Sequence, residues 1–184
     1  MRRVRRRPPG AVLLFEDETI LRLFPPLRCA WAPQGEQAEV PLSGWNARRV
    51  LFGALNPRTG HRVVMRRAAM RRGDFQEFLR LLRRCYGGRE LWLLLDGASC
   101  HIATQSQRLA AQLNIKLLWL PVRCAELNAM DHLWRHLKGQ LAANRQFASV
   151  DELAERAEQW VLDLSPREAL RKAGVLSKNF WLPT

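Results

Sequence analysis

The chain has 184 residues, with 30 Lys and Arg side chains against 17 Asp and Glu, and a formal net charge of +13 at pH 7. This length suits one domain with a buried core, and a hydrophobic content of 47% excludes a wholly disordered protein. No apolar run approaches the ~20 residues that a membrane-spanning helix needs, so a membrane protein is excluded.

The opening third predicts antiparallel strands after a flexible basic arm, MRRVRRRPPG. Residues 11–18, AVLLFEDE, form an apolar run that ends in acids, and we expect a strand with Asp17 at its carboxyl end. Residues 48–56 and 61–65 are two further apolar segments, and the turn sequence PRTG between them is a hairpin signal. These segments predict three antiparallel strands.

The pattern changes in the middle of the chain. Residues 73–86 place phenylalanine and leucine at helical spacing, whereas residues 90–97 form a continuous apolar run, typical of a strand covered on both faces. A second helix is predicted over 103–114 and a second buried strand over 115–121. A strand, a helix and a strand at this spacing predict a parallel pair with a right-handed crossover.

The C-terminal third predicts helices. One covers about residues 126–144, and two more begin at Ser149 and Ser165, each with a glutamate three residues later that suggests a capping box. The order of elements predicts an α/β fold, in which three antiparallel strands and then two parallel strands form one mixed sheet flanked by helices.

Three aspartates fall where such a sheet exposes ligands. Asp17 ends the first predicted strand and Asp96 ends the most apolar one, and ligands of open α/β sheets gather at the carboxyl ends of strands. Asp131 shares a helix face with Trp134 and Lys138, and this partly apolar face points toward the sheet. Converging carboxylates repel one another unless a cation lies between them, and oxygen ligands favour Mg²⁺ or Mn²⁺. Two such ions support phosphoryl transfer.

Each acid also has an ordinary structural interpretation. Asp96 before Gly97 is typical of a turn, and Asp17 between two glutamates is typical of solvated charge. Asp131 is expected in the first turn of a helix, where an acid interacts favourably with the helix dipole. These interpretations leave unexplained why all three acids fall at equivalent ends of predicted elements.

Histidines and cysteines give weaker signals. His101 follows Asp96 by five residues, and we expect it to contact substrate phosphate or to cap the next helix. His132 and His136 are four residues apart, but no fourth ligand has suitable spacing, so helix-surface histidines are favoured over a zinc site. The four cysteines lack paired spacing, which is typical of a reduced, cytoplasmic protein.

Positive charge is concentrated in the first half of the chain, where residues 1–90 hold 19 basic and 8 acidic side chains. Nucleic acid is the natural partner of such a surface. The alternative is a coding bias, because only four of the 30 basic residues are lysine. Besides the arm, one cluster stands out, formed by Arg66, Arg67, Arg71 and Arg72.

Three segments of the chain resemble consecutive motifs of DDE-superfamily transposases: LLFEDETILRLFPPLRCAWAPQGE, LWLLLDGASCH and IKLLWLPVRCAELNAMDHLWRHLKG. The likeness is to bacterial insertion-sequence transposases related to the mariner group. The 34 residues between Asp96 and Asp131 match the spacing of that superfamily. The resemblance implies a ribonuclease-H-like endonuclease domain over residues 11–145, with 1–10 as a flexible arm and 146–184 as helices that pack on or extend the same domain.

The resemblance also implies an activity, DNA transposition. A DNA strand is cut by water, and the freed 3′-hydroxyl then attacks target DNA. Two Mg²⁺ or Mn²⁺ ions would be held by Asp17, Asp96 and Asp131. The implied partners are the DNA of the element ends and of the target, and a second copy of the chain in the active complex. The residues expected to contact DNA are Arg66, Arg67, Arg71, Arg72, His101, Asn128 and Lys138.

Some features depart from the family pattern. Gly97 replaces Asn, Ala129 replaces Pro, Asp131 replaces Glu, and VRCA replaces a Tyr-Ser-Pro-type segment. Family members also carry N-terminal helix-turn-helix domains, so we expect a remnant or one half of a split frame, with an upstream helix-turn-helix polypeptide as partner. The alternative function is an impaired remnant that only binds DNA or a partner protein. A third option, a nuclease for junctions or RNA, is disfavoured by the tryptophan-bearing stretch 19–47.

Overall fold

One mixed sheet organises the molecule. A computed structural model of the chain describes residues 4, 7–42 and 44–182. Five strands lie side by side in the order β3-β2-β1-β4-β5. The strands are β1 Val12–Arg22, β2 Arg48–Leu55, β3 Arg62–Arg67, β4 Leu91–Leu95 and β5 Ile115–Trp119.

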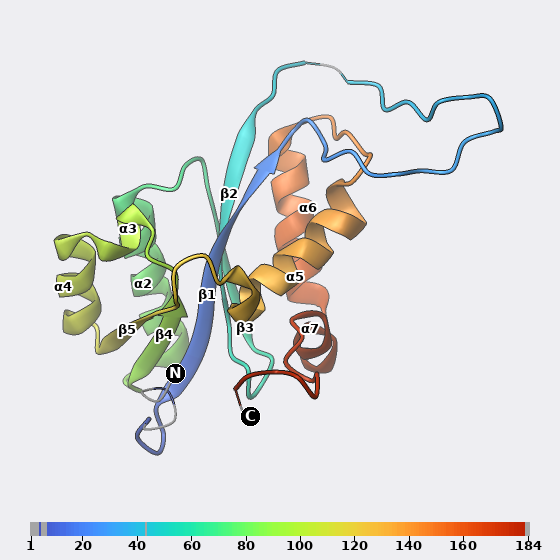
Figure 1. Cartoon of the computed structure of the whole chain (residues 1–184). Helices are drawn as coiled ribbons and strands as arrows, with labels where there is room; N and C mark the ends of the chain where they lie inside the picture. Colours follow the sequence, from blue (N-terminus) through green and yellow to red (C-terminus); the bar gives the residue numbers. More distant parts are fainter. Residues whose placement is uncertain (1–3, 5–6, 43, 183–184) are drawn as a thin grey trace.

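Helices cover both faces of the sheet, as Figure 1 shows. One face carries α2 Arg72–Tyr86, α3 Ser99–Ile102 and α4 Thr104–Gln112. The other face carries α5 Ala129–Leu137, α6 Val150–Asp163 and α7 Pro166–Lys172. Across the described residues, no helix combines the length and the apolarity required to cross a membrane.

One predicted helix forms as a single helix, and another is broken in the structure. The helix predicted over 103–114 is α4 alone, and α3 precedes it as a separate turn of helix. The helix predicted over 126–144 consists of the 3-10 turn η1 Ala125–Leu127, then α5, then the π-helical turn η2 Lys138–Ala142. Single π-helical turns are frequent at functional sites.

The strand pairing confirms the predicted α/β architecture. β1 runs antiparallel to β2, and β2 runs antiparallel to β3. β4 runs parallel to β1, and β5 runs parallel to β4. The hairpin signal and the two buried apolar runs of the sequence therefore predicted the sheet correctly, and α3 and α4 form the crossover between its parallel strands.

β1 is longer than the sequence predicts. It continues past its acids to Arg22, because its second half pairs with β2 as far as Arg48. Asp17 therefore lies in the middle of a strand and not at its end, which corrects our expectation. Pairing between β1 and β4, however, stops at Phe15 and Leu94. Asp17 thus lies just beyond the point where these two parallel strands separate.

Alternation along β1 divides the apolar core into two clusters. Odd-numbered residues such as Leu13 and Phe15 pack with α5 and α6, whereas even-numbered residues such as Leu14 pack with α2. The same alternation sends Asp17 to the α5 face and the glutamates before and after it to the α2 face. The sheet therefore presents acids on both of its faces at one level.

Both ends of the described chain pack on this body. Val4, within the predicted flexible arm, is 5% exposed and packs against the core, which differs from the expectation. The arginines of the arm at 2–3 and 5–6 lie outside the described residues. At the other end, Trp181 Nε1 donates a hydrogen bond to the Leu127 carbonyl oxygen at 2.9 Å. The C-terminal segment therefore holds the turn that leads into α5.

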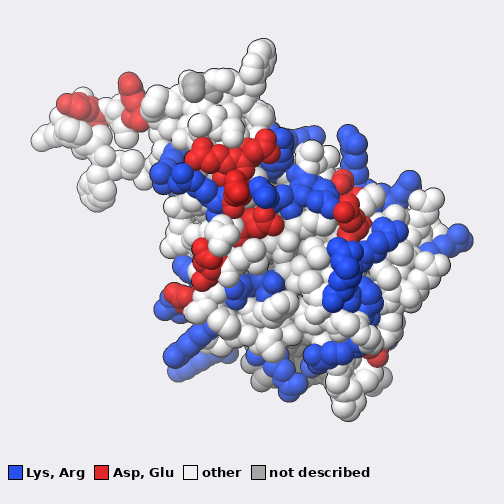
Figure 2. Space-filling view, turned by 180° about the vertical axis from the view of Figure 1, so that it is seen from behind, with Lys and Arg blue, Asp and Glu red and all other residues white. Residues whose placement is uncertain are grey.

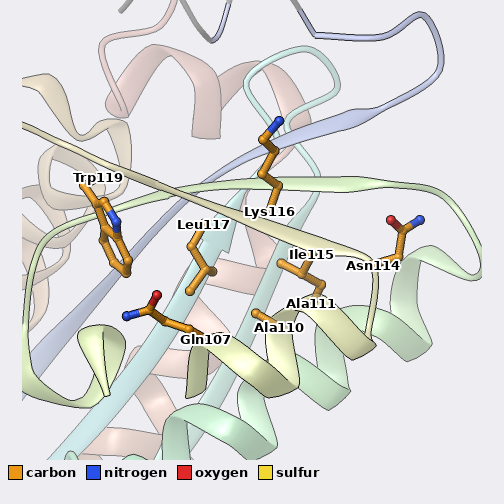
Figure 3. A pocket seen from close by; sticks show the side chains of 8 residues that line it. All are labelled: Gln107, Ala110, Ala111, Asn114, Ile115, Lys116, Leu117 and Trp119. Atoms are coloured by element: carbon orange, nitrogen blue, oxygen red, sulfur yellow. The ribbon is translucent and has the colours of Figure 1, made fainter. Parts of the chain in front are cut away.

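A hollow of about 360 Å³ lies beside β5, the edge strand of the sheet. Side chains of α4 and β5 line it, among them Ala110, Leu117 and Trp119 (Figure 3). None of the three predicted acids belongs to its lining. This hollow is therefore separate from the place where those acids lie.

Candidate active site

Asp17 lies on the face of β1 that packs against α5. The indole Nε1 of Trp134 donates to the Asp17 carbonyl oxygen at 3.4 Å, so α5 crosses β1 at this level. Burial and the carboxylates of Glu18, Asp131 and Asp96 together raise the pKa of Asp17 to about 8. The other two predicted acids are therefore close enough to Asp17 for their charges to act on it.

Asp96 lies in the turn between β4 and α3. Its Oδ1 accepts hydrogen bonds from the Ala98 backbone N–H and from His101 Nδ1, both at 2.9 Å. The hydrogen bond from His101 holds the pKa of Asp96 below its usual range, against the opposing effect of burial. Asp96 is therefore an ionised carboxylate whose orientation is set by one backbone group and one side chain.

Asp131 lies in the first turn of α5, as predicted. Asn128 caps this helix, because its Oδ1 accepts from the Met130 N–H at 3.0 Å. Its Nδ2 donates to the Glu16 carbonyl oxygen of β1 at 2.8 Å. Asn128 is 2% exposed, so its placement corrects the expectation that it contacts DNA. It anchors the helix that carries Asp131 to the central strand.

A glycine allows α5 to approach the sheet closely. Gly53 of β2 lies opposite Asp17 in the strand pairing. A Cβ at Gly53 would overlap Met130 Cε and the Trp134 ring, so no other residue fits without displacing the helix. Trp134 fills this space and is 2% exposed. The close approach brings Asp131, three residues earlier on α5, toward Asp17.

Two cationic side chains accompany the acids on the α5 face. Arg135 pairs with Asp131 one helical turn away, with Nη2 at 2.5 Å from Oδ2. Lys138 begins η2, and burial lowers its pKa while the carboxylates of Asp17 and Asp131 oppose that effect. Lys138 therefore lies beside the acids, on the face that the sequence predicted. Arg135 was missed, although its spacing of four residues from Asp131 was visible.

The opposite face of β1 carries a second group of acids around His101. The His101 side chain is 1% exposed, and its Nε2 lies 2.8 Å from Glu18 Oε1 and 3.7 Å from Glu16 Oε2. The Phe75 ring packs on the imidazole at 4.4 Å between centroids. Burial alone would lower the pKa of His101, but Glu16 and the hydrogen bonds with Asp96 and Glu18 raise it above its ordinary value. This burial corrects the expectation that His101 contacts substrate phosphate.

Glu16 is the most isolated acid of this second group. It is fully buried, and within the described structure neither carboxylate oxygen accepts a hydrogen bond. Burial and the charge of Glu18 raise its pKa well above its ordinary value. Glu18, Cys100 and His101 also bring potential metal-binding atoms within 4.8 Å of one another. This group was not predicted from the sequence, although the alternation of β1 places its two glutamates on one face.

The predicted arginine cluster is divided in the structure. Arg66 pairs with a glutamate of α6 and Arg67 with a glutamate of α2, each at 2.6 Å. Arg71 and Arg72 are exposed at the start of α2. Figure 2 shows the same mixture of charge on one face of the molecule, where basic side chains lie on both sides of a band of acidic ones. Arg71 and Arg72 are therefore the members of this cluster best exposed to a partner.

The acids on the α5 side fit a hard divalent cation. Their donors are carboxylate oxygens, which Mg²⁺ and Mn²⁺ prefer. Asp131 Oδ2 is buried and pairs with Arg135 Nη2 at 2.5 Å, so a cation bound there would replace this ion pair. A cation between the three carboxylates would also relieve the repulsion that raises the pKa of Asp17. The donor set and its charge therefore suit Mg²⁺ or Mn²⁺ better than zinc.

Comparison with known proteins places this fold among DNA-processing enzymes. The model of a family described as DDE superfamily endonuclease matches residues 12–154. A relative from Shigella sonnei, the insertion element IS630 uncharacterized 39 kDa protein, is 24% identical over 156 residues. The match covers 84% of this chain and 46% of that protein, so the chain spans less than half of the relative's length.

Solved structures of Mos1 transposase have a similar fold. The Mos1 paired-end complex with the left transposon end has a TM-score of 0.72 and 17% identity, over 97% of this chain and 56% of that chain. The mariner Mos1 paired-end complex with Mg has a TM-score of 0.70 and 17% identity, over 95% of this chain and 55% of that chain. These likenesses confirm the predicted ribonuclease-H-like architecture.

Proposed function

The chain belongs to the DDE superfamily endonuclease family, and we propose that it is the catalytic domain of a DNA transposase. Its reactions are metal-dependent cleavage of a DNA strand by water and transfer of the freed 3′-hydroxyl end to target DNA, without a covalent protein–DNA intermediate. The observation that carries this proposal is the approach of Asp17, Asp96 and Asp131 from three separate segments. The insertion-element name of the Shigella relative supports it.

We assign Asp17, Asp96 and Asp131 as the ligands of two Mg²⁺ or Mn²⁺ ions. The all-oxygen donor set supports this assignment, as does the similarity of the fold to a Mos1 complex with Mg. Bound ions would supply activation of the attacking hydroxyl and stabilisation of the leaving oxygen. The chain itself holds the carboxylates, Asp96 through the bonds at its turn and Asp131 through the cap that ties α5 to β1.

DNA is the proposed substrate, both as element ends and as target. Lys138 lies beside two of the acids, where its ammonium group would attract a phosphate that approaches them. Arg71 and Arg72 add exposed positive charge for contacts to the DNA backbone. Arg66 and Arg67 are already paired with glutamates, so we propose that they contribute less to DNA binding.

A second copy of the chain is the proposed partner in the active complex. The loop between β1 and β2, described for residues 23–42 and 44–47, extends far from the sheet (Figure 1). Trp31 on this loop is 103% exposed and Trp45 is 90% exposed. Large apolar side chains that protrude in this way favour a contact that covers them. We therefore assign the loop to contact with the second copy.

We also propose that a second kind of polypeptide takes part in recognising the DNA of the element ends. The chain spans 46% of the Shigella relative and 56% of the Mos1 chain. We therefore propose a polypeptide with helix-turn-helix domains as the partner that reads the element ends. Within the chain, we propose residues 11–145 as the catalytic domain and 146–184 as helices that pack on or extend it. Because the proposed substrate is DNA, we place the activity in the cytoplasm.

An impaired remnant that binds only DNA or a partner transposase is the second candidate. One observation favours it, the ion pair between Arg135 and Asp131, which neutralises the third acid without a metal. The two candidates share a fold and a basic surface, and they differ in whether the acids bind a divalent ion. Metal binding therefore separates them.

The decisive experiment combines a Mn²⁺ titration by calorimetry with nicking of a supercoiled plasmid. Wild type should bind Mn²⁺ saturably and nick, whereas Asp17→Asn, Asp96→Asn and Asp131→Asn should lose both and still bind DNA. Asp163→Asn, the same change at the exposed end of α6, should behave as wild type. DNA binding without saturable Mn²⁺ binding would establish the remnant, and full nicking by Asp96→Asn would overturn the site assignment.

A further inference from the structure

Two of the acids, Asp17 and Asp96, lie on neighbouring segments of the sheet. Each acid lies past the point at which the two segments stop pairing with each other. β1 and β4 pair only as far as Phe15 and Leu94, and both acids lie beyond this point. No strand ladder therefore holds the two carboxylates at a defined separation. A pair of metal ligands on two diverging segments needs some other connection between those segments.

His101 supplies that connection. Its Nδ1 lies 2.9 Å from Asp96 Oδ1 and 3.2 Å from the Asp96 carbonyl oxygen. Its Nε2 lies 2.8 Å from Oε1 of Glu18, the residue after Asp17 in β1. The backbone N–H of His101 bonds to the Ala98 carbonyl oxygen at 2.9 Å, which fixes the short helix α3 that carries the ring. The imidazole thus spans from one acid to the strand that carries the other.

We propose that His101 is a positioning residue, which orients the Asp96 carboxylate for metal binding by bridging it to Glu18. This inference rests on the proposed metal-dependent function and assigns His101 no contact with DNA. In the described structure His101 and the Ala98 N–H both bond to Oδ1, which leaves Oδ2 to face a ligand. The Asp96 side chain is 61% exposed, so without these bonds it would populate several rotamers.

The surroundings of the ring make the bridge rigid. The side chains of His101 and Glu18 are 1% and 5% exposed. Water therefore competes little for these hydrogen bonds, which strengthens them. Hydrogen-bonded partners of metal ligands typically contribute 10- to 100-fold to metal affinity or activity. An effect of that size is expected here.

The same side chains do not form a zinc site in the observed arrangement. Glu18, Cys100 and His101 bring donor atoms within 4.8 Å of one another. Two ligands of a tetrahedral zinc ion, each at roughly 2.1 Å from it, lie about 3.4 Å apart. His101 Nε2 and Glu18 Oε1 are 2.8 Å apart, a hydrogen-bond distance that leaves no room for an ion between them.

Two substitutions of His101 test the two hydrogen bonds of the bridge one at a time. The amide nitrogen of His101→Asn takes roughly the place of Nδ1 and keeps the bond to Asp96. The amide nitrogen of His101→Gln reaches the place of Nε2 and keeps only the bond to Glu18. Both replacements are polar and uncharged, so they disturb the buried site to a similar degree. Phe75→Leu is the stability control, because it removes packing on the ring and leaves the bridge.

The readouts are Mn²⁺ affinity of the DNA-free protein by calorimetry and electron paramagnetic resonance, plasmid nicking, and Tm. We expect His101→Gln to weaken Mn²⁺ binding and nicking 10- to 100-fold and His101→Asn to stay within about threefold of wild type. Both variants should lower Tm by similar amounts. Phe75→Leu should lower Tm while the Mn²⁺ affinity of the folded protein stays unchanged.

Two results would overturn the positioning role. One is wild-type Mn²⁺ affinity in His101→Gln. The other is a loss of affinity in His101→Asn as large as that in His101→Gln, because the loss would then not depend on the bond to Asp96. Absence of saturable Mn²⁺ binding in the wild type is a different failure, because it removes the proposed metal-dependent function and the inference with it.

Discussion

The two faces of β1 carry acids in opposite electrostatic states. On the α2 face, the carboxylates of Glu18 and Asp96 share the buried imidazole of His101, which satisfies them from within the chain. On the α5 face, Asp17 keeps a pKa of about 8 although Lys138 lies beside it. Glu18 is thus paired with an imidazole inside the fold, whereas the neighbouring Asp17 stays under the net repulsion of the surrounding carboxylates.

This difference shows how one strand serves two purposes. Alternation turns Asp17 and Glu18 to opposite sides, so neighbouring residues enter separate environments. On the α2 side Glu18 has a fixed partner in His101, although the buried Glu16 accepts no hydrogen bond from the described residues. The α5 side is arranged like a site for an external cation, because its acids repel one another in the cation's absence. Substitutions on each side should therefore have different consequences.

The largest expected effect is on activity. Asp17→Asn should reduce Mg²⁺-dependent nicking by roughly 10³-fold, since a lost metal ligand removes several kcal/mol of transition-state stabilisation. Glu18→Gln keeps the oxygen that meets His101 and should cost at most about tenfold. Rates of plasmid nicking by the two variants measure the contrast. Equal losses would mean that the two faces do not differ in function.

The next effect concerns the close contact between α5 and the sheet. Gly53→Ala places a Cβ against Met130 and Trp134 and should destabilise the fold by about 2 kcal/mol, with reduced nicking because α5 carries Asp131. Gly73→Ala, in the first turn of α2 where a Cβ meets no atom within 4 Å, should be neutral or slightly stabilising. Urea unfolding measures both variants. A neutral Gly53→Ala would show that the approach of α5 is loose.

A smaller effect is expected on the thermal stability of the metal-free protein. The folded protein holds the Asp17 proton up to pH about 8, far above the ordinary value of 3.8, so Asp17 costs stability increasingly as pH rises from about 4 to 8. Asp17→Asn removes this cost and should raise the metal-free Tm by about 5 °C at pH 8, with little change near pH 4. Thermal scans in EDTA measure it, and Asp163→Asn at the exposed end of α6 should show no such gain. A pH-independent gain would contradict the interpretation.

The smallest expected effect is on DNA binding, and it compares the exposed Arg72 with the paired Arg66. Arg72→Ala should weaken DNA binding a few-fold and lower the slope of log affinity against log salt by about 0.9, because an exposed cation contacts phosphate. Arg66→Ala should change the slope less, since Arg66 is paired with Glu158. Fluorescence anisotropy with duplex DNA at several salt concentrations gives the slopes. Equal slopes for the two variants would contradict this distinction.

Much of the fold could be predicted because its signals are local. The apolar runs before Asp96 and before Pro121, the PRTG turn and the serine caps each depend on residues close in the chain. The position of Asp131 on α5 followed from helical spacing in the same way. The extent of β1 could not be predicted, because its second half is a strand only through pairing with β2.

The roles of individual polar residues were predicted less well. His101 and Asn128 look like residues for DNA contact, since both are polar and lie near acids in the sequence. In the structure both are buried and their polar atoms are engaged by other segments, Glu18 for one and the Glu16 carbonyl for the other. Whether a residue is buried depends on how the sheet and the helices pack together, so no local sequence pattern predicts it.

By itself, the amino-acid sequence determined the order of the strands and helices, the basic character of the chain and the three aspartates, since each of these depends on composition or short-range spacing. Only the tertiary structure decided which charges are neutralised within the fold. The electrostatic state of an acid depends on burial and on groups a few ångströms away, and for Asp17 and Glu18 those groups include Asp131 and His101, which lie on helices more than 80 residues distant along the chain.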